Sequence, residues 1–130
     1  MSWLLNHYRA PTRVLAWIGI FTIVVLSVVP ANERPVTSAE LWFGLVYGHW
    51  LEHFAAFALV AAVFAIGYRF SPIRLLLLAF LFCGGIELLQ LPLPTRHARV
   101  SDFVIDFLGA CFAIVVVFAS GKLFRHHADV

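Results

Sequence analysis

The sequence GGIELLQLPLPTRHARVSDFVIDFLG, residues 84–109, organises this chain. It joins two strongly apolar runs through a turn with two prolines, and proline ends a helix because its φ is fixed and its N–H is missing. Glu87 and Gln90 precede the turn, three residues apart, and Asp102 and Asp106 follow it, four residues apart. Each spacing places both side chains on one side of a helix. Two helices joined by a tight turn are therefore expected to bring the two polar pairs together.

The composition indicates the kind of protein in which this polar stretch lies. Hydrophobic residues make up 62% of the 130 residues and charged residues 12%, with a mean hydropathy of +0.93, whereas a soluble domain has about 45–50% and 25%. The chain is therefore predicted to be a membrane protein, with room for one compact bundle and no separate soluble domain. Cys83 and Cys111 lie in apolar runs without a CxxC spacing and are expected to be small core residues.

Apolar runs outward from this stretch predict four membrane spans, at approximately residues 14–30, 49–68, 73–91 and 102–121. The predicted fold is all-α, a transmembrane four-helix bundle that forms a single domain over residues 1–130. The first run is long for the apolar core of a signal peptide, so we expect a retained span.

Local signals add detail at the ends of these spans. Residues 37–40, Thr-Ser-Ala-Glu, offer a helix start, and Leu41–Tyr47 is amphipathic enough to lie at the membrane interface. Ser101 is a plausible N-cap for the last span, and Asp102 is well placed at the positive end of that helix.

The distribution of Lys and Arg predicts the orientation in the membrane. With four spans, one side holds six basic residues: Arg9, Arg13, Arg69, Arg74, Lys122 and Arg125. The other side holds three: Arg34, Arg96 and Arg99. Because basic residues accumulate in the cytoplasm, both termini are predicted to be cytoplasmic. The polar stretch would then open to the outer face, together with His49, Glu52 and His53 in the first turns of the second span.

These hydrophilic side chains are the candidate functional residues, because polar groups inside a membrane span are rare and mark sites. The candidate ligand-binding residues are His53, Glu87, Gln90, Arg96, Arg99, Asp102 and Asp106. If the site is catalytic, the candidates are Glu52, His53, Glu87 and Asp102. An acidic side chain in mid-membrane disfavours insertion by about 2.5–3.5 kcal/mol. We expect relief of this cost by pairing with an arginine or a histidine, or by protonation; a network that only orients the helices is the simpler alternative.

The stretch from residue 84 onward resembles the VanZ-like family of small bacterial membrane proteins. The residues that carry the resemblance are Glu87, Gln90, Pro94, Arg96, Asp102, Asp106 and Gly109. The family pattern has Asn where Asp106 stands, and this departure adds a negative charge. His53-Phe54 also looks like the His-Phe of the family's second span, whereas His49 and Trp50 stand where many members have Asp-Lys.

The resemblance implies a multi-pass protein of the bacterial cytoplasmic (inner) membrane, in a family linked to glycopeptide resistance without an agreed activity. We therefore expect a cell-envelope role, in which the outer-face site binds or modifies a membrane lipid or a lipid-linked envelope precursor. Arg96 and Arg99 would meet a phosphate, since the planar guanidinium can bind it through two hydrogen bonds. The carboxylates would orient a sugar or an amine.

Two other functions compete with this one. HWLEH, residues 49–53, matches the HxxEH pattern of one class of zinc peptidases. A zinc-dependent membrane hydrolase would use His49 and His53 as ligands and Glu52 as the catalytic residue, with Glu87 or Asp102 as a third ligand. A non-enzymatic scaffold would instead use the small residues Gly109 and Ala113 to pack against another helix. We predict no resident cofactor. We also predict no nucleic-acid partner, because the basic residues are scattered at membrane borders and form no basic face.

Overall fold

The computed structural model describes residues 2–30, 33, 36–68, 70–94 and 99–128, with only the backbone described for residues 2–8, 40 and 122–128. Four α-helices account for almost all of this: α1 (Ser2–Val28), α2 (Ser38–Gly67), α3 (Pro72–Gln90) and α4 (Val100–Ala128). No strand occurs in these ranges. Each helix is long and apolar enough to cross a membrane, over residues Arg9–Val28, Leu41–Gly67, Pro72–Gln90 and Val100–Gly121. The prediction of an all-α fold with four membrane-type helices is confirmed.

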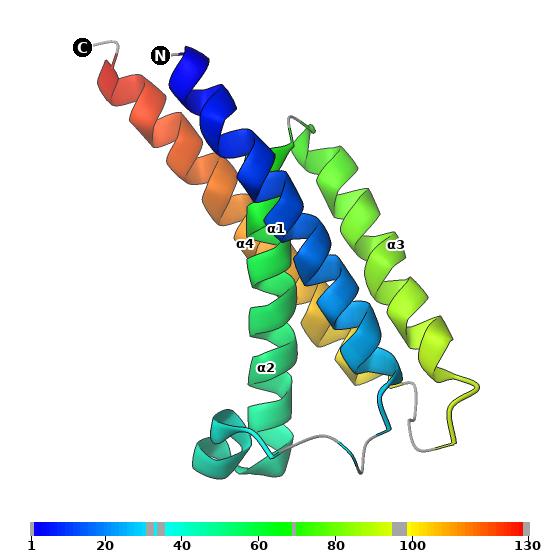
Figure 1. Ribbon diagram of the computed structural model, residues 1–130. Coiled ribbons are helices and arrows are strands. Elements are labelled where there is room, and N and C mark those ends of the chain that lie inside the picture. The colour runs from blue at the N-terminus through cyan, green and yellow to red at the C-terminus, as the bar shows by residue number, and fades with distance from the viewer. Residues whose placement is uncertain (1, 31–32, 34–35, 69, 95–98, 129–130) are drawn as a thin grey trace.

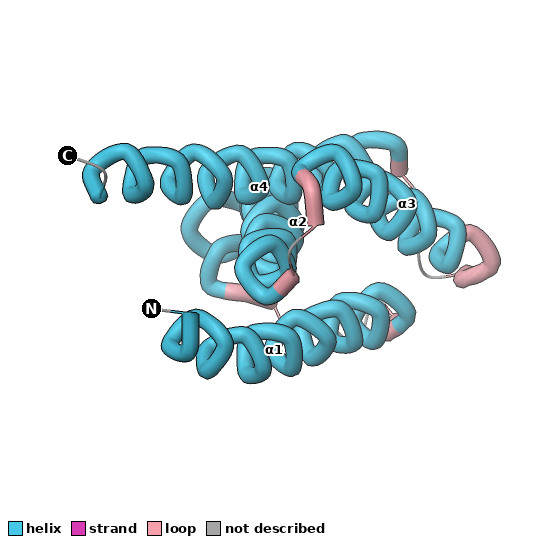
Figure 2. Tube along the Cα trace, turned by 90° about the horizontal axis from the view of Figure 1, so that it is seen from above, coloured by secondary structure: helices cyan, strands magenta, loops and turns pink. Residues whose placement is uncertain are grey.

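The helices form a bundle in which α2 and α4 are the closest-packed pair. Figure 2 shows α2 between α1 on one side and α4 on the other, and α3 packs mainly on α4. In Figure 1 the beginning of α1, the end of α4 and the α2–α3 connection lie at one end, which we call the upper end. The α1–α2 and α3–α4 connections lie at the opposite, lower end.

The helices extend beyond the expected spans at several points. The first begins at Ser2 rather than near residue 14 and carries Pro11 inside it, and the last continues to Ala128. A helix need not stop where its apolar run stops, because its backbone groups stay hydrogen-bonded in water as well. The predicted N-cap role of Ser101 is wrong, because α4 already begins at Val100 and the N–H groups of Asp102 and Phe103 donate to the Arg99 carbonyl.

Gly44 divides α2 into a short first segment and the long span. Its φ of 79° and ψ of 159° are outside the helical region and essentially restricted to glycine. The short segment begins where residues 37–40 predicted a helix start, with the Leu41 N–H donating to the Thr37 carbonyl. Figure 1 shows it turned aside from the bundle, and Trp42 within it is 83% exposed. An interfacial position for Leu41–Tyr47 stays a prediction.

Two apolar clusters form the core of the bundle. One cluster is built around Ile23, Phe57, Cys83 and Ile86, and the other around Ala65, Leu75 and Ile114. Both cysteines are free; Cys83 is buried and Cys111 half-buried.

At the upper end, polar contacts tie α1 to the C-terminus of α2. The Arg13 Nε donates to the Gly67 carbonyl at 3.0 Å, and its guanidinium carbon lies 5.0 Å from the centre of the Tyr68 ring. The Trp17 indole N–H donates to the Tyr68 hydroxyl at 2.8 Å. A cation near the last carbonyls of a helix is favourable there.

Candidate functional site

Two histidine–aspartate pairs connect α2 and α4 near the lower end. The Nδ1 of His53 lies 2.8 Å from the Oδ1 of Asp106, a hydrogen bond in which the imidazole N–H donates to the carboxylate. One turn away, the Nε2 of His49 lies 3.5 Å from the Oδ2 of Asp102. The two rings are tilted against each other with centroids 4.2 Å apart. The two histidines are four residues apart, and so are the two aspartates, so the two pairs lie one helical turn apart between α2 and α4.

The short distance between the two helices has a local cause in Gly109. A Cβ atom on Gly109 would overlap the carbonyl oxygen of Phe54, so no larger residue fits there without a shift of the backbone. The missing side chain therefore lets the backbone of α4 approach that of α2. Phe54 directly follows His53, and Gly109 lies three residues after Asp106. The same close approach thus brings the Asp106 carboxylate within reach of the histidine.

Glu87 adds a third helix to the site. Its Oε2 accepts a hydrogen bond of 2.9 Å from the backbone N–H of Arg99, at the start of α4. The first N–H groups of a helix have no partner within the helix, and a carboxylate is favoured beside them. The Glu87 side chain therefore joins the end of α3 to the beginning of α4. Asp102 accepts a further hydrogen bond, of 3.2 Å, from the Ser101 hydroxyl.

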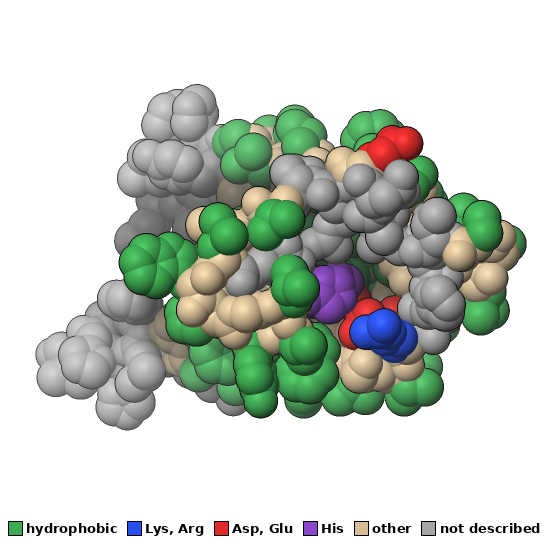
Figure 3. All heavy atoms as spheres, turned by 90° about the horizontal axis from the view of Figure 1, so that it is seen from below, with side chains coloured by type: hydrophobic (Ala, Val, Ile, Leu, Met, Phe, Trp, Pro, Cys, Tyr) green, Lys and Arg blue, Asp and Glu red, His purple; other side chains and the backbone are tan. Residues whose placement is uncertain are grey.

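Two carboxylate oxygens in this site are buried and accept no hydrogen bond from the described residues: Oε1 of Glu87 and Oδ2 of Asp106. Asp106 is 0% exposed, so its second oxygen cannot be satisfied by open solvent. A buried acceptor of this kind is costly when it has no partner, so it favours a hydrogen-bond donor in the site. Figure 3 shows the site from the lower end, where a histidine side chain lies beside acidic and basic side chains in a mostly apolar surface.

The structure brings together His49, His53, Glu87, Asp102 and Asp106. Gln90 is the last residue of α3 and is buried, and the Arg99 side chain is exposed at the same end. Glu52 is half-buried on α2. Arg96 lies outside the described residues. The binding or catalytic role of these residues stays a prediction.

Sequence reasoning did not foresee which partners would pair. It placed His49 in the outer polar layer and named it as a potential metal ligand, but it did not assign it a partner, whereas the structure places this ring against Asp102. The shared spacing of four residues in His49/His53 and in Asp102/Asp106 is the signal that could have indicated two parallel pairs.

The described residues contain no group of three His, Cys, Asp or Glu side chains that could hold a metal ion. The two histidines of the HxxEH pattern are directed to different aspartates of α4, and the zinc-peptidase alternative stays a prediction. The geometry is that of a hydrogen-bonded acidic site with two imidazoles.

Comparison with known proteins gives one result. A family model described as VanZ/LLP1 matches residues 8–124, which include all of α2 and α3, most of α1 and α4, and every residue of the site. Neither the curated proteins nor the solved structures contain a significant match.

Proposed function

Because the chain belongs to the VanZ/LLP1 family, we propose that this multi-pass membrane protein binds the headgroup of an envelope lipid, or of a lipid-linked envelope precursor, at its lower end. The observation that carries the proposal is the meeting of three carboxylates and two imidazoles from three membrane-type helices. Polar groups of this kind are expensive in a membrane and are kept where they serve a site.

The chemistry of the site fits a headgroup that carries both hydrogen-bond donors and an anionic group. The two buried oxygens of Glu87 and Asp106 that have no partner among the described residues would accept hydrogen bonds from hydroxyl or amine groups that enter the site. Arg99, exposed at the beginning of α4, would bind a phosphate, and Arg96 is proposed to do the same. The proposed location is the bacterial cytoplasmic membrane with the site on its outer face, and a contribution to antibiotic resistance would follow from altered handling of an envelope lipid.

The binding proposal is tested with purified protein in lipid nanodiscs. Native mass spectrometry would measure retained phosphatidylglycerol, phosphatidylethanolamine and a polyprenyl phosphate, for the wild type and for Arg96→Ala and Arg99→Ala. We expect selective retention of at least one of these lipids and a loss of about tenfold or more in each variant, since removing a charge-assisted hydrogen bond weakens binding by roughly 1.5–3 kcal/mol.

Arg74→Ala is the matched control, because Arg74 is exposed in the first turn of α3 at the upper end, away from the site. It should bind as the wild type does. Equal retention of all three lipids by the wild type and both site variants would contradict the proposal and favour a scaffold.

A further inference from the structure

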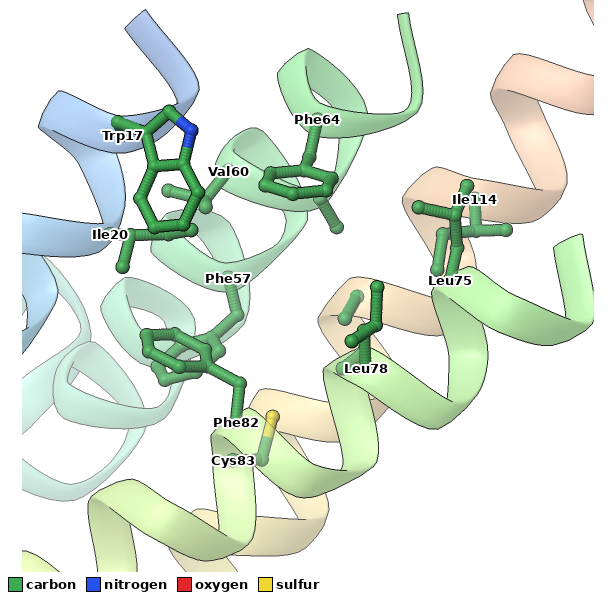
Figure 4. A pocket seen from close by; sticks show the side chains of 13 residues that line it. Trp17, Ile20, Phe57, Val60, Phe64, Leu75, Leu78, Phe82, Cys83 and Ile114 are labelled. Atoms are coloured by element: carbon green, nitrogen blue, oxygen red, sulfur yellow. The ribbon is translucent and has the colours of Figure 1, made fainter. Parts of the chain in front are cut away.

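An apolar cavity of about 250 Å³ lies in the membrane-spanning part of the bundle. Figure 4 shows its walls: Trp17 and Ile20 come from α1, Phe57 and Phe64 from α2, and Leu78 and Phe82 from α3. Ala110 and Ile114 of α4 close the remaining side. All thirteen lining residues are apolar or cysteine. An apolar cavity of about 150 Å³ already stays dry and binds benzene, so this larger one suits a hydrocarbon occupant.

The cavity is accessible from the lipid side. Trp17 is 57% exposed and Leu78 46% exposed, although both side chains line the cavity. These residues belong to α1 and α3, which contact each other less than either contacts its main partner. A gap between two membrane-type helices would open into the acyl chains of a bilayer, so a chain can enter from the side without crossing the polar end.

One end of the cavity adjoins the polar site on all three helices that build that site. Phe57 lies four residues after His53, and Ala110 lies four residues after Asp106. Cys83 lies four residues before Glu87, on a helix that runs in the opposite direction along the bundle to α4. Four residues are about one turn, or roughly 5.4 Å along each axis. The hydrogen-bonding groups and the apolar cavity are therefore consecutive layers of one bundle.

From this continuity we propose that the cavity binds one hydrocarbon chain of the same lipid whose headgroup occupies the polar site. The inference rests on the proposed function and extends it from a headgroup to a whole amphiphile. On α3 the lining runs from Leu75 to Cys83, a rise of eight residue steps, or roughly 12 Å. A stretch of chain of that length lies inside the protein, and the remainder leaves between α1 and α3 into the bilayer.

The test uses a phosphatidylglycerol with a diazirine in the middle of one acyl chain, incorporated into nanodiscs with the full-length protein. After irradiation, mass spectrometry of peptides would locate the crosslinked residues. We expect crosslinks concentrated on the cavity-lining positions of α1 and α3. Crosslinks distributed evenly over the outward-facing residues of all four helices would overturn the inference.

A substitution that fills the cavity sharpens this test. Ala61→Phe places a large side chain into the cavity from α2, and Ala56→Phe places the same side chain on the exposed face of the same helix. We expect Ala61→Phe to lower the cavity crosslinks at least fivefold and Ala56→Phe to leave them unchanged. Should Ala61→Phe fail to give monodisperse protein, Ala79→Phe fills the cavity from α3. Cavity crosslinks that persist in a folded filling variant would count against the inference.

The failure of this inference is distinguishable from failure of the headgroup proposal. If Arg96→Ala and Arg99→Ala lose lipid while the crosslinks lie outside the cavity, the chain site is wrong and the headgroup site stands. If both arginine variants retain lipid normally while Ala61→Phe abolishes the cavity crosslinks, the headgroup site is wrong and the chain site stands.

Discussion

Asp106 is a fully buried carboxylate in a helix that is long and apolar enough to cross a membrane. Among the described residues its hydrogen-bond partner is the His53 ring, at 2.8 Å. A charged or polar group is tolerated in a protein interior when it is hydrogen-bonded. In Asp106 one of the two carboxylate oxygens, Oδ1, is hydrogen-bonded, and Oδ2 is not bonded by any described residue. The family pattern discussed above has Asn at this position, and an amide oxygen can also accept from an imidazole N–H. The hydrogen bond to His53, rather than the charge itself, is therefore what we expect to hold α2 and α4 together at this point.

We predict that Asp106→Asn lowers the free energy of unfolding by about 1 kcal/mol or less, whereas Asp106→Ala lowers it by roughly 1–3 kcal/mol, because alanine leaves the N–H of the half-buried His53 ring without its acceptor. Unfolding by SDS in detergent micelles, followed by circular dichroism, measures both. The control is a double-mutant cycle with His53→Phe, which should give a coupling energy of about 0.5–3 kcal/mol. Additive losses in the cycle would show that the pair does not stabilise the fold.

At the scale of the helices, sequence reasoning succeeded where the signal is local. Apolar runs of sufficient length predict membrane-type helices by themselves, and the spacing of Asp102, Asp106, Gly109 and Ala113 predicts a stripe that faces other helices. The structure has all four buried.

Contacts between helices could not be predicted in the same way. A single sequence does not say that Gly109 meets the backbone of Phe54, and that contact decides which carboxylate faces which histidine. The kink at Gly44 also escaped prediction, because a glycine in an apolar run is compatible with a straight helix. The extension of α1 to Ser2 was missed because the residues before the first apolar run carry no apolar pattern that would mark them as part of the helix.

The close approach of α2 and α4 leads to a prediction for Gly109→Ala. The added methyl group would overlap the Phe54 carbonyl oxygen and lie 3.1 Å from two further backbone atoms of Phe54, so the helices must separate. We expect a loss of roughly 1–3 kcal/mol in the free energy of unfolding, as for other overpacked contacts. Gly121→Ala is the control in the same helix, because nothing lies within 4 Å of its Cβ, and it should be neutral or slightly stabilising. Equal unfolding curves for the two variants would contradict the packing argument.

For the whole molecule, the two ends of the bundle differ in charge and in chemistry. The lower end holds the acidic site, with Glu87, Asp102 and Asp106. At the upper end, the Arg13 side chain donates a hydrogen bond to the carbonyl of Gly67, the last residue of α2. Both chain ends lie on one side of the bundle, as an even number of spans requires. The bundle can therefore have only two orientations in the membrane, with both ends of the chain in the cytoplasm or both outside the cell. The orientation determines whether the site faces the cytoplasm or the cell exterior.

The excess of basic residues on the side of the termini, six against three, predicts that the upper end is cytoplasmic and that the acidic site faces outward. In a Cys83→Ala/Cys111→Ala background, Glu33→Cys labels the α1–α2 connection and Ser71→Cys the α2–α3 connection. We expect an impermeant maleimide to modify Glu33→Cys in intact spheroplasts and Ser71→Cys only after permeabilisation. Both positions are exposed in the fold, so access to the reagent and not burial determines the result. The reverse pattern would place the site in the cytoplasm, where a headgroup of the outer leaflet could not reach Glu87 and Asp106.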